Sequence, residues 1–296
     1  MTTTDAAISH VSDTAFLVAQ YRAAESARPD ALFHDPFAEK LSGTKGRAIG
    51  AVINRHMTGW SVAVRTVVID DLIREAITTG TDTVLSLGAG LDARPYRLDL
   101  PKDLLWIEVD YADVIAYKEG VLSSAVPHCR LESVSVDLSD SSERRAFLST
   151  LKGRSRNLLV LTEGVIPYLK NEEVATLADD LREIADSTQV SWIVEYLPKR
   201  VYLHRGDRAR RQMKNAPFRF RPDDWFAFFA SHGWRQRSIR YLGLEGIRLG
   251  RRAPLPWKTR MMMRIARLLR RKRNRGQLER LLGYSTLEPI PASGNN

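Results

Sequence analysis

The sequence has almost no cysteine, no long apolar run and no metal-binding spacing. Its single cysteine, Cys129, excludes a disulfide within the chain. No Cys/His cluster and no His-Glu-x-x-His pattern occurs, so we expect no metal site. No apolar run approaches the roughly 18 residues of a membrane span, and residues 1–5 lack the basic and apolar regions of a signal peptide. We therefore expect a cytoplasmic protein without a membrane span.

The size and composition fit one globular domain with appendages. The chain has 296 residues, of which 44% are apolar and 27% are charged. We predict a helical cap over residues 1–80 and a core over residues 81–250, with an insertion at about 197–221 that forms a lid. Residues 251–296 are predicted to form a basic helical extension and a tail, with the end from Glu288 frayed.

The charge is strongly and unevenly positive. There are 45 Lys and Arg against 35 Asp and Glu, and the excess gathers in residues 208–211 and 264–275. Such clusters attract nucleic acid, an anionic membrane or an acidic substrate. The alternative is a solvated helix face, with Ile265, Leu268 and Leu269 in the buried stripe. We favour this alternative and expect no nucleic-acid partner, because the sequence has no aromatic RNA-stacking motif.

A glycine turn follows a short apolar strand and points to a bound nucleoside. The predicted strand over residues 83–87 runs into Gly88 and Gly90, whose lack of a Cβ lets the backbone approach a ligand. A second apolar strand, residues 104–110, ends in Asp110, at a spacing typical of a carboxylate that binds ribose hydroxyls. The alternative is a turn without a ligand. The pattern favours an adenosine-containing cofactor at the carboxyl ends of parallel strands.

Strands alternate with helices along the rest of the core. Apolar runs at 131–136, 157–162 and 189–195 predict further strands of a parallel sheet. Asn171 is the expected N-cap of the clearest helix, and the aromatic segment 222–233 predicts another. Residues 234–242 and 246–249 are expected to form a final antiparallel pair.

The glycine turn favours S-adenosylmethionine over a nicotinamide dinucleotide. A dinucleotide site normally has a third glycine, whereas this turn reads Gly88-Ala-Gly-Leu-Asp-Ala-Arg94 and places Asp92 where it would repel a pyrophosphate. S-adenosylmethionine has no phosphate and carries an ammonium and a sulfonium, so carboxylates are useful in its site. Methyl transfer then needs little beyond alignment of the methyl carbon with the nucleophile.

Several short motifs occur in an order that resembles the leucine carboxyl methyltransferase family. This family includes a methyltransferase of protein phosphatase C-termini and bacterial O-methyltransferases of polyketides and other secondary metabolites. The resemblance covers roughly residues 12–200 and implies an α/β, Rossmann-like methyltransferase fold, with a mainly parallel seven-stranded sheet and a terminal antiparallel hairpin. The motifs are Ala31–Phe37, Arg65-Thr66, Asp70-Asp71, Leu87–Asp92, Arg94–Arg97, Trp106–Asp110, Lys118 and Leu161–Leu169.

The resemblance implies how the methionine end of the cofactor is held. Arg65 would pair with the cofactor carboxylate, a contact that can be bidentate. Gly88, Ala89 and Gly90 would lie under the methionine part, and Glu163 near the ammonium. The alternative for Arg65 is a surface charge.

The resemblance also implies contacts to the nucleoside. Asp110 would bind the ribose, while Asp137 and the backbone of Leu138 would recognise adenine. Arg22 is a second basic residue that would face the cofactor carboxylate, although its spacing to the following motif is loose. The alternative for Asp137 is a cap of the helix near Ser141.

The methylated group decides whether the site needs a base. A carboxylate is already ionised at neutral pH, whereas a phenol must lose a proton. His204, in the predicted lid beside Tyr202 and Arg205, is our candidate base if one is needed. Tyr202 and Arg205 are candidate substrate contacts, as is Tyr168, for which a place in the core is the alternative.

We therefore predict an S-adenosylmethionine-dependent O-methyltransferase that leaves S-adenosylhomocysteine as product. Its acceptor would be the carboxylate or acidic phenol of a small molecule, in bacterial secondary metabolism if the resemblance extends that far. The alternatives are carboxyl methylation of a peptide or protein C-terminus and, in another class, a basic RNA-binding or RNA-modifying protein.

Overall fold

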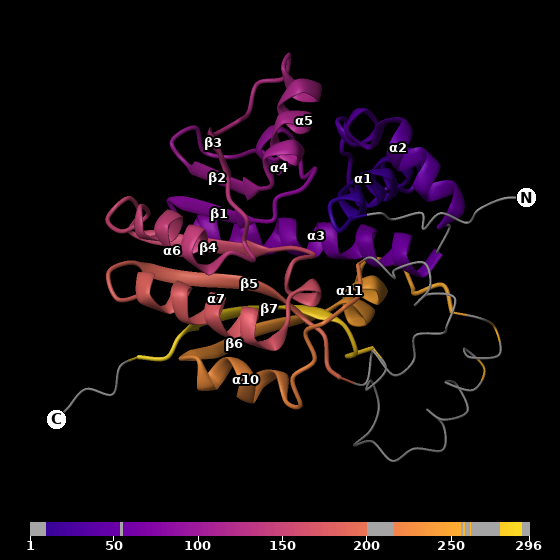
Figure 1. Cartoon of the computed structure of the whole chain (residues 1–296). Helices are drawn as coiled ribbons and strands as arrows, with labels where there is room; N and C mark the ends of the chain where they lie inside the picture. The colour runs from indigo at the N-terminus through magenta and orange to yellow at the C-terminus, as the bar shows by residue number, and fades with distance from the viewer. Residues whose placement is uncertain are drawn as a thin grey trace, which may run out of the picture.

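The computed structural model describes residues 10–53, 56–199, 216–255, 257, 261 and 279–291. Its centre is a seven-stranded sheet in the order β3-β2-β1-β4-β5-β7-β6 (Figure 1). Strands β1 to β5 are parallel, and β7 runs antiparallel to both β5 and β6. The predicted fold class is confirmed. The strands are β1 (Thr83–Leu87), β2 (Leu105–Asp110), β3 (Arg130–Ser135), β4 (Asn157–Thr162), β5 (Gln189–Tyr196), β6 (Trp234–Tyr241) and β7 (Gly283–Pro289).

The order of the strands creates a switch point beside β1. The chain passes from β1 outward to β2 and β3, then returns to place β4 on the other side of β1. In open parallel sheets, ligands bind outside the carboxyl ends of the strands at such a point. The five strands predicted from apolar runs between residues 83 and 195 all form within one or two residues of the expected bounds.

Helices cover both faces of the sheet because its central strands, β1, β2, β4 and β5, are buried on both sides. One face, which includes Leu85, Val160 and Trp192, packs against α6, α7 and α10. The other, with Trp106 and Ile193, packs against α3 and α11. The aromatic residues of α10 belong to the first of these cores. The helices are α3 (His56–Thr78), α6 (Ser141–Ser149), α7 (Asn171–Ile184), α10 (Trp225–Ser231) and α11 (Leu242–Arg248).

The N-terminal helices divide between two roles. Helices α1 (Asp13–Ser26) and α2 (Ala38–Val52) lie together beyond the carboxyl ends of the strands, where they form a third apolar cluster with α5 (Ala112–Leu122) (Figure 1). Helix α3 instead forms part of the layer that covers the sheet. The short elements α4 (Arg94–Arg97) and η1 (Ile166–Tyr168) follow β1 and β4.

The predicted antiparallel pair was partly wrong. Residues 242–248 form helix α11, and the partner of β6 is β7, which comes some 40 residues later and inserts between β5 and β6. Glu288, expected in a frayed end, therefore lies within a strand. Asn171 is the first residue of α7 and not its cap; its side chain accepts a hydrogen bond from the backbone of Arg221.

The described ranges have neither a helix suited to a bilayer nor a cluster of metal-ligating side chains. None of the helices there has the length and apolar character that a bilayer crossing requires. In the same ranges, no three His, Cys, Asp or Glu side chains come together in a way that would hold a metal ion.

The position of β7 predicts that its buried side chains support the whole sheet. Leu287 is 1% exposed and pairs with Trp192 of β5, so we expect Leu287→Ala to lower the free energy of unfolding by about 2 to 5 kcal/mol. Glu288→Ala on the same strand is the control, because that side chain makes a partly exposed ion pair with Arg235. Chemical denaturation of both variants checks this, and equal effects would contradict the placement of β7.

Candidate functional site

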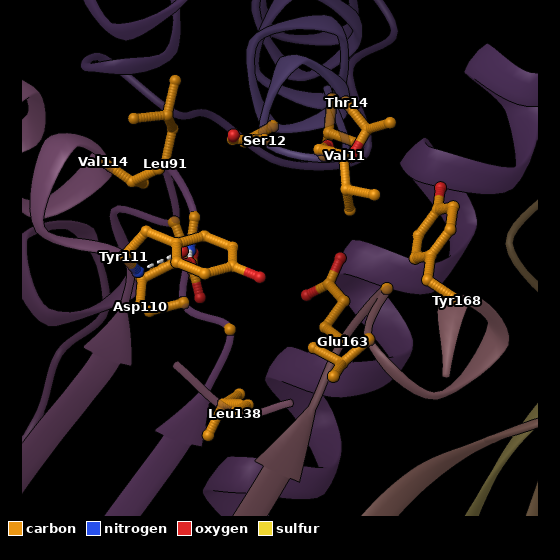
Figure 2. A pocket seen from close by; sticks show the side chains of 18 of the residues that line it. Val11, Ser12, Thr14, Leu91, Asp110, Tyr111, Val114, Leu138, Glu163 and Tyr168 are labelled. Atoms are coloured by element: carbon orange, nitrogen blue, oxygen red, sulfur yellow. Dashed lines mark hydrogen bonds between the residues drawn. The ribbon is translucent and has the colours of Figure 1, made fainter. Parts of the chain in front are cut away.

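A cavity of about 410 Å³ lies at the switch point of the sheet (Figure 2). Its floor is formed by the ends of β1, β2 and β4, and α1 closes the opposite side. Its volume falls in the usual range for small-molecule sites. The residues lining it include Val11, Ser12, Thr14, Arg22, Arg65, Gly88–Asp92, Asp110, Tyr111, Val114, Leu138, Ser139, Glu163–Val165, Tyr168, Leu169, Glu173, Pro217 and Arg219.

The glycine turn after β1 has a backbone conformation that favours glycine, and the space beside Gly88 is too small for a Cβ. Gly88 and Gly90 adopt φ values of 65° and 53°, which L-residues rarely adopt. A Cβ on Gly88 would lie 2.4 Å from Cγ2 of Val165. Gly88, Ala89 and Gly90 line the cavity, and their role as a cofactor cradle stays a prediction.

Asp110 ends β2 at the edge of the cavity and is fixed by two backbone donors. The amide of Gly90 donates to Oδ2 at 2.6 Å, and the amide of Tyr111 donates to Oδ1 at 2.8 Å. Burial raises the pKa of Asp110, while these two hydrogen bonds oppose the rise. The carboxylate is thus held rigidly beside the glycine turn, in the position expected for a ribose contact.

The predicted adenine contacts lie partly on the cavity. Leu138 lines it together with Val114 and Leu91, which gives an apolar slot next to Asp110. Asp137 is not part of the lining. Its Oδ1 accepts hydrogen bonds from the backbone and hydroxyl of Ser139. It is not the helix cap either, because Asp140 caps α6.

A buried network of arginines and carboxylates supports the cavity floor. Arg94 is completely buried and contacts three acids: Asp70 at 2.6 Å, Asp92 at 2.6 Å and Glu163 at 2.7 Å. Although burial opposes ionisation, Arg94 holds the pKa of Asp92 and of Glu163 below its ordinary value. Arg97 adds a bidentate pair with Asp70.

The two arginines predicted to face the cofactor carboxylate both reach the cavity. Arg65, on α3, lies with its Nε 2.9 Å from Oε1 of Glu163, so it is no surface charge. Arg22, on α1, pairs with the buried Asp35 at 3.2 Å and also donates to the carbonyl of Leu91. Glu163 therefore sits between two arginines, Arg65 and Arg94.

Glu195 lies behind this group, at the end of β5. Glu195 as a residue is 4% exposed, and its Oε1 accepts a hydrogen bond from the amide of Gly164, the residue after Glu163. Among the residues that the structure describes, its other oxygen, Oε2, has no hydrogen-bond partner. Burial raises the pKa of Glu195 to about 7, while the Gly164 hydrogen bond and Arg65 oppose the rise.

The side of the cavity beyond Glu163 has a different character. Tyr168 lines it (Figure 2). The Tyr168 ring packs edge-on against the ring of Phe218, with the two ring centroids 5.1 Å apart. Pro217 and Arg219 also line the cavity. Tyr168 is thus a cavity residue and not only a core residue. Tyr202, His204 and Arg205, the other candidates for substrate binding and catalysis, lie outside the described residues.

Sequence reasoning missed three kinds of site residue. The start of α1 (Val11, Ser12, Thr14) gave no signal, because its closeness to the turn depends on how the N-terminal helices pack. Arg94 was noted only as part of a motif, since sequence spacing does not show which acids surround an arginine. Glu195 ends a predicted strand beside that of Glu163, and this adjacency was the available signal for it.

The residues present fit S-adenosylmethionine. The cradle at Gly88 has no room for a side chain, Asp110 is fixed for a diol, and Arg65 and Glu163 provide opposite charges for an amino acid. The fold agrees with this. A methyltransferase-like protein from Thermobifida fusca, 16% identical, superposes with a TM-score of 0.53 over 84% of this chain and 92% of its own. The chain is an α/β protein with the methyltransferase fold.

Comparison with known proteins gives the family. The family model described as leucine carboxyl methyltransferase matches residues 15–182, and the chain belongs to the leucine carboxyl methyltransferase family. The resemblance predicted from the motifs is confirmed. A relative from Mycobacterium bovis is 31% identical over 82% of this chain and 86% of its own length. A second relative, from Streptomyces coelicolor, is 31% identical over 77% of this chain and 87% of its own length.

The names of these relatives bear on the cofactor. Both are provisionally named S-adenosyl-L-methionine-dependent methyltransferases. S-adenosylmethionine is the cofactor predicted from the sequence of this chain. A DUF574 family protein from Streptomyces avermitilis, 14% identical, shares the fold with a TM-score of 0.50 over 93% of this chain and 97% of its own.

The raised pKa of Glu195 predicts a pH-dependent stability. Between about pH 4.5 and 7, the folded state keeps a proton that the unfolded state has lost, so the free energy of unfolding should fall as pH rises through this window. The fall should be about 3 kcal/mol. Denaturation from pH 5 to 8 should show it in the native protein and in Glu132→Gln, a surface control, but not in Glu195→Gln. The same slope in all three would contradict the raised pKa of the buried Glu195.

Proposed function

We propose that the protein transfers the methyl group of S-adenosylmethionine to the carboxylate of a small acidic molecule, and so is an O-methyltransferase. The observation that carries this proposal is the lining of the cavity. Within the described part of the chain, the lining contains arginines and tyrosines but no histidine, lysine or cysteine. A carboxylate acceptor needs no base because it is already ionised, whereas a phenol does.

The cofactor would be held at both of its ends. Asp110 would accept hydrogen bonds from the ribose hydroxyls, and the apolar slot at Leu138 would take the adenine, with Asp137 at its edge. Gly88, Ala89 and Gly90 would lie under the methionine part. The closeness of Asp110 to the turn, through its bond to Gly90, supports this arrangement.

The amino acid end would meet the paired charges at the floor. Arg65 would bind the cofactor carboxylate, with Arg22 nearby, and Glu163 would bind the ammonium. Arg94 supports this assignment, because it keeps Glu163 ionised without itself lining the cavity.

The acceptor would enter beside Tyr168. Arg219 is the exposed cation of that wall, and a guanidinium there suits a carboxylate. The chain's formal charge of +10 would draw acids toward the site. The family name refers to a carboxyl group, which supports the same acceptor chemistry. We propose a product of bacterial secondary metabolism, such as a polyketide-like acid, as the acceptor.

The chemistry demands little of the protein. Bound S-adenosylmethionine supplies a methyl carbon activated by the adjoining sulfonium. The residues of the chain would align the acceptor oxygen with this carbon and exclude water, which removes much of the barrier. Tyr168 and Arg219 would orient the acceptor, and Glu163 with Arg65 would fix the donor.

Binding of S-adenosylhomocysteine tests the cofactor site. We expect Asp110→Ala and Arg65→Ala each to weaken binding about 10- to 100-fold, because each removes a charged hydrogen-bond partner. Asp113→Ala is the matched control, since Asp113 is exposed on α5 beside the site but does not line the cavity. Calorimetry measures the affinities. Tight binding that neither substitution weakens would refute the site.

The pH dependence of methyl transfer tests the acceptor class. At saturating cofactor and acceptor, the rate with a carboxylic acid should stay flat within about threefold from pH 6 to 9. A panel of small aromatic acids and their phenol counterparts, followed by mass shift of one methyl group, distinguishes the classes. A rate that is confined to phenols and climbs steeply with pH would overturn the carboxylate assignment and require a base.

A further inference from the structure

The charges around the methionine end of the cavity are balanced except at one position. Four arginines of the network are matched by four carboxylates in direct ion pairs. The arginines are Arg22, Arg65, Arg94 and Arg97, and the carboxylates are Asp35, Asp70, Asp92 and Glu163. Glu195 lies against this group, but the described residues give its carboxylate no ion-pair partner within 4 Å.

Glu195 does not itself line the cavity but contacts a residue that does, Gly164. Its Oε1 accepts the hydrogen bond of the Gly164 amide, and Gly164 lines the cavity directly after Glu163. Its Oε2 is buried and has no hydrogen-bond partner in the described part of the chain. Thus the ionisable carboxyl group of Glu195 is separated from the cavity by Gly164. It lies next to the position proposed for the amino acid and sulfonium parts of the donor.

The groups facing Glu195 keep fixed charges around neutral pH. Of the described elements packed against this end of β5, α3 presents Arg65, β4 presents Glu163 and β7 presents Tyr284, the register partner of Glu195. The pKa of Arg65 is raised and that of Glu163 is lowered, so both stay ionised; burial keeps Tyr284 neutral. Glu195 is the group of this set whose pKa, about 7, allows it to change charge.

We propose that Glu195 is a positioning residue that distinguishes the cationic methyl donor from its neutral product through the uncompensated negative charge that it places behind the Gly164 wall. This inference rests on the proposed function. When the methyl group leaves, the electron pair of the S–CH3 bond stays on sulfur and the sulfonium becomes a neutral thioether. A carboxylate behind the wall therefore stabilises the bound donor more than the bound product.

The consequence is a proton coupled to exchange of product for donor. With the neutral product bound, Glu195 takes up a proton from water more readily, and it releases this proton when the cation binds. The affinity for the donor relative to the product should therefore rise with pH. The expected size is roughly tenfold, the order for two charges several ångströms apart at intermediate dielectric.

The test measures the affinities of S-adenosylmethionine and S-adenosylhomocysteine by calorimetry from pH 5.5 to 8.5. In the native protein, the ratio of the product dissociation constant to that of the donor should rise roughly tenfold. In Glu195→Gln, which keeps an acceptor for Gly164, it should change less than about twofold. Any contribution from Asp110 cancels in the ratio, because both ligands carry the same ribose.

Two controls make the outcome clear. Glu132→Gln, the same substitution on β3 at the surface, should keep the native ratio. If Glu195→Gln does not fold, calorimetry of the native protein in buffers of different ionisation enthalpy still tests the inference, because the donor should release more protons near pH 7 than the product does. Failure of both ligands to bind would refute the proposed function. Binding of both with a native ratio that does not change, or that changes equally in Glu195→Gln, would refute the role of Glu195.

Discussion

The buried guanidinium of Arg94 is the constraint on which the site depends. It joins α3 through Asp70, the glycine turn through Asp92 and the end of β4 through Glu163. A fully buried cation is costly unless every charge around it is matched, and removing one member leaves the others uncompensated. The three segments therefore hold one relative position, and the cavity lies above them.

The cavity has two rigid ends that differ in polarity. At the nucleoside end, Asp110 is fixed by backbone amides and stands beside apolar side chains, where the geometry favours a diol and a flat ring. At the other end, Arg65 and Glu163 face each other across 2.9 Å, and each carries the charge that an amino acid requires of its partner. Arg65 has α3 behind it and Glu163 has Arg94, so neither depends on the ligand for its position.

The sequence predicted what local patterns determine. Alternating apolar runs predicted β1 to β5, and the spacing from Gly90 to Asp110 predicted a carboxylate at the end of the second strand, which the structure places beside the glycine turn. Prediction from the sequence failed where segments that are distant in the chain meet in the fold. The seventh strand, residues 283–289, pairs with β5 and β6 across a long connection, and the approach of α1 to the turn depends on packing of the N-terminal helices. Asp137 lies between the lining residues Val136 and Leu138 without lining the cavity itself, because sequence spacing does not show which way a loop side chain points.

The most direct test of the central claim is a crystal structure of the protein with S-adenosylhomocysteine. The account predicts the nucleoside over the turn at Gly88 to Gly90, ribose hydroxyls on Asp110 and the ligand carboxylate on Arg65. A ligand bound elsewhere, or a cavity that stays free of it at saturating concentration, would contradict the account.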